Sequence, residues 1–380
     1  MMTSMSLIGT VSGLVGFALA DDKALATLPH ALQFVGMMSI TYPASMLMGR
    51  IGRQGGFMVG VAFALAGASL AAYGIVSRDF VVFCFGSFLI GGSTAFGQYY
   101  RFAAADVASV EYRSRAISWV LSGGVVAAFA GPNLAGFTQA LVSDVQFVGG
   151  YITVIILGCM TFLVLLLVRV PKVVAQGTKP AAPARPLPEI IRTPTYAVAV
   201  LCGAIAYGTM ALVMTATPLA MRANGLPFTD TVFVIQWHIL GMYGPAFFTG
   251  NLIRRFGVIP VMQVGAGLSA LCAVINLQGD TTPYVLAGLF SIGVGWNFLF
   301  TGATTLLTET YSENEKAKAQ GFNDLIVFGG LACAALASGS MHFYLGWGTL
   351  NAVMFVPPIV ASVLLLWLRG HRKRAGAVAA

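Results

Sequence analysis

Charge is scarce in this sequence. Only 9% of its 380 residues are charged, whereas 57% are hydrophobic and the mean hydropathy is +0.83. A soluble globule of this size needs far more polar surface than such a composition supplies. The composition therefore excludes a soluble domain and predicts a chain whose main partner is the lipid bilayer.

Side chains that do chemistry are also few. There are five cysteines and four histidines, and every cysteine falls inside a long hydrophobic run, where a disulfide framework is unusual. The sequence holds no nucleotide-binding loop, no catalytic triad and no hydrolytic metal motif. These absences exclude the common enzyme classes, and we expect no organic cofactor.

Acidic residues number 13 against 21 lysines and arginines, which gives a net charge of +8. The basic residues are placed as in membrane proteins, because only Lys23, Arg78 and Arg222 fall on one side of the predicted spans if the N-terminus is cytoplasmic. Basic residues concentrate on the cytoplasmic side of membrane proteins. The charge therefore predicts a multi-pass topology with both termini in the cytoplasm, and no nucleic-acid partner is expected.

Long hydrophobic runs dominate what is present. A bilayer core about 30 Å thick takes roughly 20 apolar residues per helix. Twelve windows of this kind lie between charged or Pro- and Gly-rich breaks, near residues 3–20, 28–48, 56–76, 80–104, 116–138, 148–169, 194–219, 230–252, 258–277, 283–307, 319–341 and 347–368.

The chain also repeats itself. The longest polar stretch, with five prolines, follows the sixth window, and similar residues recur across it at an offset of about 203. We therefore predict an all-α membrane protein with twelve transmembrane helices in two pseudo-symmetric six-helix bundles. The predicted domains are an N-terminal bundle at 1–170, a cytoplasmic linker at 171–193 and a C-terminal bundle at 194–380.

Two short motifs sharpen this prediction. Residues 250–257 (GNLIRRFG) resemble the G-x-L-x-D-R-x-G-R loop motif of major facilitator transporters, and residues 45–53 (SMLMGRIGR) are a degenerate copy. Arg254 and Gly49 stand where the family has an acidic residue. Residues 131–136 (GPNLAG) are similar to the family's G-P-x-x-G-G element, whose small residues let helices approach closely. The resemblance implies the major facilitator fold and transport by alternating access of the two halves.

Soft ligands occur at helical spacing in two consecutive spans. Met210 and Met214 are four residues apart in the seventh span, and His238 and Met242 are four apart in the eighth, so each pair shares a helix face. Thioethers and a neutral imidazole suit Cu(I), whereas hard cations prefer oxygen ligands. The spacing alone favours methionines that only fill the core over a metal site.

The same two pairs resemble the signature of bacterial CcoA-like copper importers, a major facilitator branch that supplies copper for assembly of cbb3-type cytochrome oxidase. This resemblance implies that copper is the transported substrate, that Met210, Met214, His238 and Met242 bind it, and that it crosses the bacterial inner membrane inward. Release then calls for modest affinity or for handover to a cytoplasmic acceptor, such as a thiol or a copper chaperone.

Other residues are candidates for accessory roles. Cys202 is a candidate relay ligand, and His30 and Met37 are candidates for first contact with incoming metal, although a buried cysteine or a histidine near a helix end is commonly structural. Arg101 lies within the fourth span, and we expect it to form an inner gate by pairing with Asp106 or Glu309.

The sequence is compatible with two other functions. An organic-solute transporter is the first, because a neighbouring branch of the family is linked to riboflavin; its binding residues would be Arg101, Trp296, Asn297, Tyr99 and Tyr100. The second is a membrane-bound metal sensor or assembly factor that binds without transport, which the lack of a soluble domain disfavours.

Overall fold

The computed structural model describes residues 1–100, 103–104, 113–140, 146–167, 185–312 and 314–378, and every regular element in these ranges is helical. The helices of the first half are α1 (Met2–Leu19), η1 (Lys23–Leu25), α2 (Leu28–Val76), α3 (Phe80–Gly97), α5 (Arg113–Thr138) and α6 (Val148–Leu167). Those that follow are α7 (Leu187–Ile191), α8 (Pro194–Ala223), α9 (Phe228–Tyr243), α10 (Ala246–Phe256), α11 (Val258–Gln278), α12 (Thr282–Thr308), α13 (Lys316–Met354) and α14 (Val356–Val378).

Helices of the described ranges overlap each of the twelve predicted spans, with α5 at the fifth and α9 and α10 at the eighth. Eight helical segments in the described ranges are long and apolar enough to cross a membrane, and two of them, Lys23–Val76 and Lys318–Arg374, run for 54 and 57 residues. Because one crossing takes roughly 20 residues, each of these two is long enough for two crossings. The all-helical fold class is confirmed.

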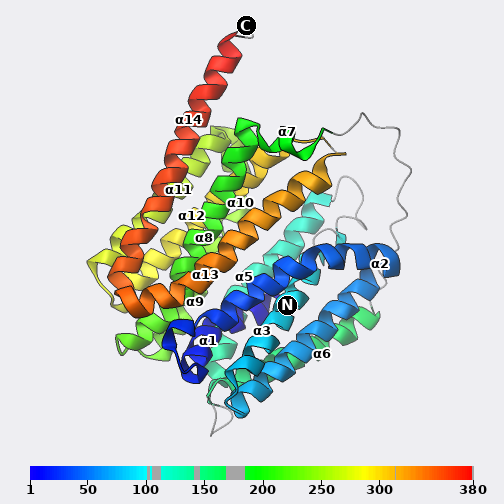
Figure 1. The fold of residues 1–380 in the computed structure, drawn as a ribbon, viewed down its shortest axis with the longest axis vertical. Helices are drawn as coiled ribbons and strands as arrows, with labels where there is room; N and C mark the ends of the chain where they lie inside the picture. The colour runs from blue at the N-terminus through cyan, green and yellow to red at the C-terminus, as the bar shows by residue number, and fades with distance from the viewer. Residues whose placement is uncertain (101–102, 105–112, 141–145, 168–184, 313, 379–380) are drawn as a thin grey trace.

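Glycines make the turns inside the two long helices. Gly52 in α2 has φ 85° and Gly346 in α13 has φ 79°, and the chain turns back on itself at both points (Figure 1). A positive φ is a conformation that glycine adopts at little cost. Gly257, between α10 and α11, has φ 88° and ψ 157°, close to the 85° and 166° of Gly52. The matching glycines of the two copies of the predicted loop motif thus have the same backbone conformation.

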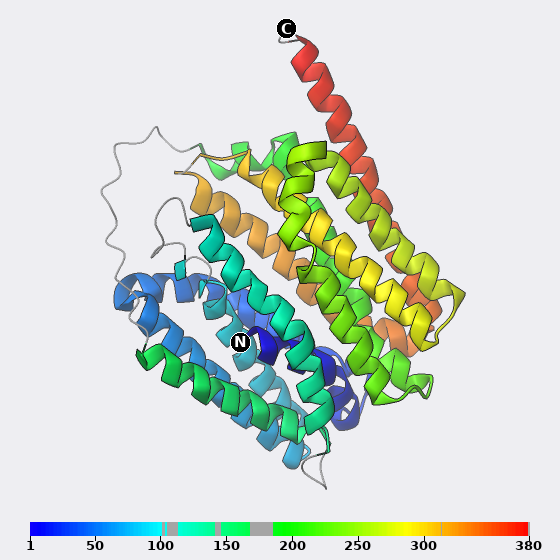
Figure 2. The same cartoon turned by 180° about the vertical axis from the view of Figure 1, so that it is seen from behind.

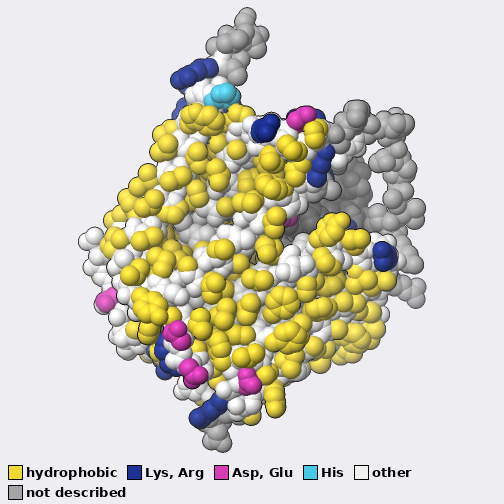
Figure 3. All heavy atoms as spheres, viewed as in Figure 1, with side chains coloured by type: hydrophobic (Ala, Val, Ile, Leu, Met, Phe, Trp, Pro, Cys, Tyr) yellow, Lys and Arg dark blue, Asp and Glu magenta, His cyan; other side chains and the backbone are white. Residues whose placement is uncertain are grey.

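The outer surface is apolar around its middle and charged at its ends. Figure 3 shows hydrophobic side chains over most of one face, with Lys, Arg, Asp and Glu at the two ends. Large apolar side chains such as Leu167, Trp119 and Phe137 are at least three-quarters exposed. A soluble monomer rarely exposes so much apolar area, so this surface suits the hydrocarbon core of a bilayer.

The helices form two groups. Figures 1 and 2 show the blue-to-teal helices α1 to α6 on one side and the green-to-red helices α8 to α14 on the other. The largest buried apolar cluster is built almost wholly from the second group, and a second cluster is built mainly from α1, α2, α3 and α6. The domain boundaries themselves stay a prediction, because residues 168–184 of the expected linker lie outside the described ranges. Within 185–193, the structure has the short helix α7.

Small residues bring helices together as the sequence predicts. A Cβ placed on Gly131 of α5 would lie 2.9 Å from the backbone nitrogen of Leu7 in α1. Gly293 allows the same close packing of α12 against α9, because a Cβ there would lie 3.2 Å from the backbone nitrogen of Met242. The expected role of the 131–136 element in close helix packing is confirmed at Gly131.

The two halves meet at one end of the molecule, which we call the joined end. The Thr27 hydroxyl donates to the Leu336 carbonyl at 3.3 Å and accepts from the Gly339 N–H at 3.1 Å. Ser340 Oγ donates to the Ala24 carbonyl at 3.1 Å. The Arg222 guanidinium, from α8, lies 5.2 Å from the ring centroid of Phe17 in α1. With the predicted topology, the joined end faces outward and the opposite end, which carries α7, faces the cytoplasm.

Candidate substrate site

Aromatic residues lie near the middle of three membrane-spanning helices of the second half. Tyr207 is close to the midpoint of α8, Trp296 is close to that of α12, and Phe328 is close to the middle of the α13 segment before Gly346. In transporters built from two repeated halves, substrate sites lie near the bilayer midplane, between the halves. The three side chains lie at the corresponding depth.

The rings contact one another as a cluster of Tyr207, Trp296, Phe300, Phe328 and Tyr243. Trp296 and Phe300 stack with centroids 5.3 Å apart and planes 15° apart. Tyr207 meets both rings edge-on, at 5.1 Å and 4.8 Å. Phe328 lies 5.8 Å from Tyr207, and Tyr243 lies 6.3 Å from Trp296. Offset-stacked and edge-on pairs are the favourable geometries for aromatic rings, so this aromatic cluster is a well-ordered apolar surface.

The aromatic cluster also faces the first half. A Cβ on Gly124 of α5 would lie 2.7 Å from the Tyr243 ring. Tyr207 and Phe328 pack against a small group of buried residues that includes Met37 of α2 and Ala95 of α3. The rings therefore lie at the interface between the two halves.

Helices α8 and α13 give the distance between the aromatic cluster and the joined end. Thr215, which packs near Gly13 of α1, is eight residues beyond Tyr207 on α8, and Leu336 is eight residues beyond Phe328 on α13. At 1.5 Å per residue, both separations are about 12 Å. The aromatic cluster thus lies about two helical turns inside the joined end.

The Asn297 side chain fixes α12 beside the aromatic cluster and is not itself available to a solute. Its side chain, 3% exposed, accepts a hydrogen bond from Thr249 Oγ1 at 2.6 Å and donates one to the Met242 carbonyl at 2.6 Å. Both ends of the amide are therefore occupied in joining α12 to α9 and α10. The neighbouring Trp296 is held at a fixed level by these bonds, whereas its own Nε1 has no hydrogen-bond partner among the described residues.

The predicted copper ligands all lie in the second half. Met210 and Met242 belong to one buried apolar cluster, and Met214 packs against the same cluster. Met214 reaches toward α1 and α2, because a Cβ on Gly9 would lie 3.4 Å from its Cε and 3.8 Å from His30 Cε1. His238 is fully buried, and its Nδ1 lies 2.8 Å from the Leu289 carbonyl of α12. The described contacts therefore place Met214 and His30 near Gly9 of α1 and the His238 ring against α12.

The protonation of His238 follows from its partner. A carbonyl only accepts hydrogen bonds, so Nδ1 carries a proton, and in the neutral ring Nε2 then holds the lone pair. Nε2 is buried and has no partner among the described residues. This orientation is the one found in metal-binding histidines. The four-ligand set remains a prediction.

The accessory candidates are buried. Cys202 is 0% exposed, Met37 is 3% exposed, and His30, at 6%, meets the Phe34 ring edge-on at 4.9 Å. The relay and first-contact roles of these three residues stay predictions.

Only one member of the predicted inner gate lies in the described part of the chain. Arg101 and Asp106 lie outside the described residues. Glu309 pairs with Arg372 of α14, at 2.7 Å between Oε2 and Nη2, and both side chains are about 40% exposed. The described partner of Glu309 is thus the C-terminal helix, which the sequence reasoning did not anticipate.

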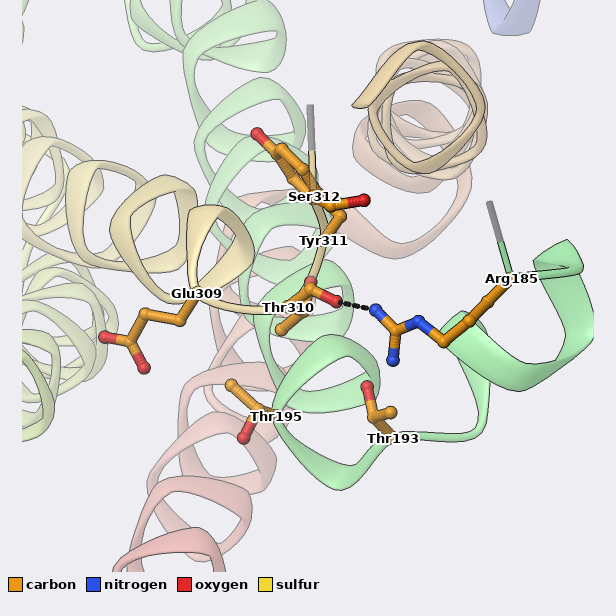
Figure 4. A pocket seen from close by; sticks show the side chains of 7 residues that line it. All are labelled: Arg185, Thr193, Thr195, Glu309, Thr310, Tyr311 and Ser312. Carbon is orange, nitrogen blue, oxygen red and sulfur yellow. Dashed lines mark hydrogen bonds between the residues drawn. The ribbon is translucent and has the colours of Figure 1, made fainter. Parts of the chain in front are cut away.

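A polar pocket lies at the end opposite the joined end. It has a volume of about 390 Å³ and is lined by Arg185, Thr193, Thr195, Glu309, Thr310, Tyr311 and Ser312. Figure 4 shows the Arg185 guanidinium directed at the backbone of Thr310, with Glu309 pointing away from it. Arg185 also binds Glu315 through its Nε and Nη2 atoms, at 2.7 Å and 2.8 Å. This pair attaches the chain just before α7 to the start of α13.

The residues predicted to bind an organic solute do not all lie together in the structure. Tyr99 donates to the Thr41 carbonyl at 3.0 Å, and Tyr100 stacks on Phe57 at 4.3 Å, so both take part in packing of the first half. Trp296 lies in the aromatic cluster. Sequence reasoning missed Tyr207, Phe300 and Phe328, and the available signal was an aromatic residue near the middle of each of three predicted spans.

Comparison with known proteins identifies the family. The sequence profile of the Major Facilitator Superfamily matches residues 1–275 and 199–379. The chain therefore belongs to the Major Facilitator Superfamily, and it is a membrane transporter rather than an enzyme.

Individual relatives cover nearly the whole chain. The riboflavin transporter RfnT of Brucella anthropi is 40% identical over 378 residues, covering 99% of this chain and 94% of the relative. The uncharacterized MFS-type transporter YdeG of Bacillus subtilis is 28% identical, covering 95% and 87%. A crystal structure of a bacterial homologue of the iron transporter ferroportin in an inward-facing state gives a TM-score of 0.71 at 13% identity, covering 96% of this chain and 95% of that one. This last likeness shows the fold alone.

These relatives change which of the predicted substrates is favoured. Transport by a major facilitator protein is confirmed. Copper as substrate and a part in cytochrome oxidase assembly find no support among them, and the 40% identity to a riboflavin transporter favours the organic-solute alternative.

Proposed function

We propose that this protein transports riboflavin or a closely related flat heteroaromatic solute across the membrane. The observation that carries the proposal is the 40% identity to a riboflavin transporter over 99% of the chain. Identity at this level along the whole length covers every helix that lines the interface between the halves.

The chemistry of the aromatic cluster supports this substrate class. Riboflavin has a flat three-ring system that carries no charge at neutral pH. A set of stacked and edge-on rings near mid-membrane offers such a solute favourable aromatic contacts without a charge to balance. The proposed mechanism is alternating access, in which the joined end opens to admit the solute and the opposite end opens to release it.

The proposal extends to location. We place the protein in the bacterial inner membrane with both termini in the cytoplasm, since nearly all basic residues then lie on the cytoplasmic side. With this orientation, the solute enters at the joined end, and transport is uptake.

The test measures uptake of radiolabelled riboflavin in a riboflavin-requiring bacterium that lacks its own transporter. Cells that produce the wild-type protein should show saturable uptake, and cells with an empty vector should not. Absence of uptake, with the protein detected in the membrane, would contradict the proposal.

Uptake measurements in the same cells distinguish copper transport from riboflavin transport. A double variant, Met210→Leu with Met214→Leu, removes both thioethers while nearly conserving side-chain volume. We expect riboflavin uptake to stay within about twofold of wild type, because dispersion contacts are kept. Radioactive copper uptake by the wild type that the double variant loses would instead establish the copper function.

A further inference from the structure

We propose that the indole N–H of Trp296 is the hydrogen-bond donor that selects the substrate ring in this transporter. The inference rests on the proposed function and deepens it, because it names the residue and the feature of the solute that it reads. Three observations carry it: the position of the indole, its unpaired nitrogen and the way its helix is fixed.

The unpaired nitrogen is the starting observation. Trp296 is 6% exposed, and its Nε1 is buried without a partner among the described residues. Tryptophan N–H groups usually find a partner when buried, and a buried donor left unpaired is unfavourable because it has lost its hydrogen bond to water. A substrate that brings an acceptor to this position removes that cost, which makes binding favourable for the right ring.

The surroundings hold the indole in place. Asn297, the next residue, ties α12 to α9 and α10 through two 2.6 Å hydrogen bonds, and Phe300, one turn on, stacks against the indole. Such support limits the freedom of the donor before the substrate arrives, which lowers the entropy cost of binding. The third neighbour, Tyr207, comes from a different helix, α8, and its ring meets the indole edge-on at 5.1 Å between centroids.

The donor defines what it selects. An indole N–H donates and cannot accept, so its partner must be a lone pair at the edge of the bound ring, such as a carbonyl oxygen or an imine nitrogen. A flavin ring presents both kinds of acceptor along one edge. A hydrocarbon ring, or a sugar alcohol without a ring, lacks this match.

The variant Trp296→Phe tests the proposal because it keeps an aromatic ring and removes the N–H. The readout is the concentration dependence of riboflavin uptake, together with its inhibition by lumichrome, which has the ring without the ribityl chain, and by ribitol, which has the chain alone. We expect KM to rise about 3- to 10-fold, as for loss of one hydrogen bond. Lumichrome should lose potency by the same factor, and ribitol should inhibit neither protein.

Trp347→Phe is the matched control. The Trp347 Nε1 is also buried and unpaired among the described residues, but Trp347 lies in α13 beyond Gly346, away from the aromatic cluster. This variant makes the same change in volume and should leave KM unchanged. Lower maximal uptake at constant KM in Trp296→Phe would indicate a structural role alone.

The outcomes separate the two proposals. Saturable riboflavin uptake by the wild type with an unchanged KM in Trp296→Phe overturns this inference and leaves the proposed function standing. No riboflavin uptake by the wild type overturns both.

Discussion

Glu315 is a carboxylate whose charge is almost completely shielded from water. Its side chain is 4% exposed, and Arg185 binds both of its oxygens. The hydrogen bond from Arg185, followed by that from the Ser312 N–H, holds the pKa of Glu315 well below its usual range. A carboxylate with a lowered pKa in the folded state stabilises the fold above its ordinary pKa, and this contribution is lost as the pH falls through the folded-state value.

We therefore predict that Glu315→Gln lowers the thermal unfolding temperature of the detergent-solubilised protein at pH 7. The difference in unfolding temperature between wild type and variant should decrease as the pH falls below about 4, the ordinary pKa of a glutamate. Glu309→Gln is the control, because Glu309 is 45% exposed in its pair with Arg372 and exposed ion pairs contribute little. A gap of equal size at pH 7 and at about pH 3.5, below the ordinary glutamate pKa, would contradict this assignment.

At the scale of elements, the packing of α2 against α3 depends on a residue without a side chain. A Cβ on Gly91 of α3 would overlap the carbonyl of Gln33 in α2, and it would lie 2.7 Å from the Gln33 Cα. Both clashing groups belong to the backbone, so no rotamer change relieves the contact. Small residues at such crossings allow membrane helices to approach closely.

The variant Gly91→Ala should reduce the yield of monodisperse protein or lower its stability by about 1–3 kcal/mol, the usual cost of overpacking. The measurement is size-exclusion chromatography of solubilised protein, followed by thermal unfolding. Gly267→Ala in α11 is the matched control, because no atom lies within 4 Å of its new Cβ. Both changes raise helix propensity equally, so equal behaviour of the two variants would argue against the packing explanation.

At the scale of the whole molecule, the joined end must separate if the protein works by alternating access. Thr27 of the first half faces Gly339 of the second, and a Cβ on Gly339 would lie 3.1 Å from the Thr27 Cβ. Disulfides join Cβ atoms about 3.5–4.5 Å apart, so a cysteine pair here needs only a small adjustment.

We predict that Thr27→Cys with Gly339→Cys forms a disulfide on oxidation and abolishes riboflavin uptake, and that reduction restores it. The exposed Cys159 and Cys333 are first replaced by serine. Ala204→Cys with Gly330→Cys provides a control pair within the second half, because a Cβ on Gly330 of α13 would lie 3.9 Å from the Ala204 Cβ of α8. Full uptake with the Thr27–Gly339 link intact would rule out opening at this end.

Much of the fold was determined by the sequence alone. The spans are set by runs of roughly 20 apolar residues between breaks, and this is a local property that needs no knowledge of neighbours. The repeat across the linker, the glycines that turn the chain at Gly52 and Gly257, and the close packing at Gly131 are local in the same sense. These features are enough to predict the family, because each of them can be recognised in a short segment of the sequence.

Only the tertiary structure decided how the helices are rotated and which of their faces meet. Spacing places Met210 with Met214, and His238 with Met242, on single helix faces, but only packing brings Met214 near Gly9 of α1 and directs His238 at Leu289. The aromatic cluster joins residues from α8, α9, α12 and α13, and Arg185 meets Glu315 across 130 positions of sequence. Such contacts depend on helix rotation and on the joining of distant segments, neither of which the hydrophobic pattern of a fully apolar span specifies.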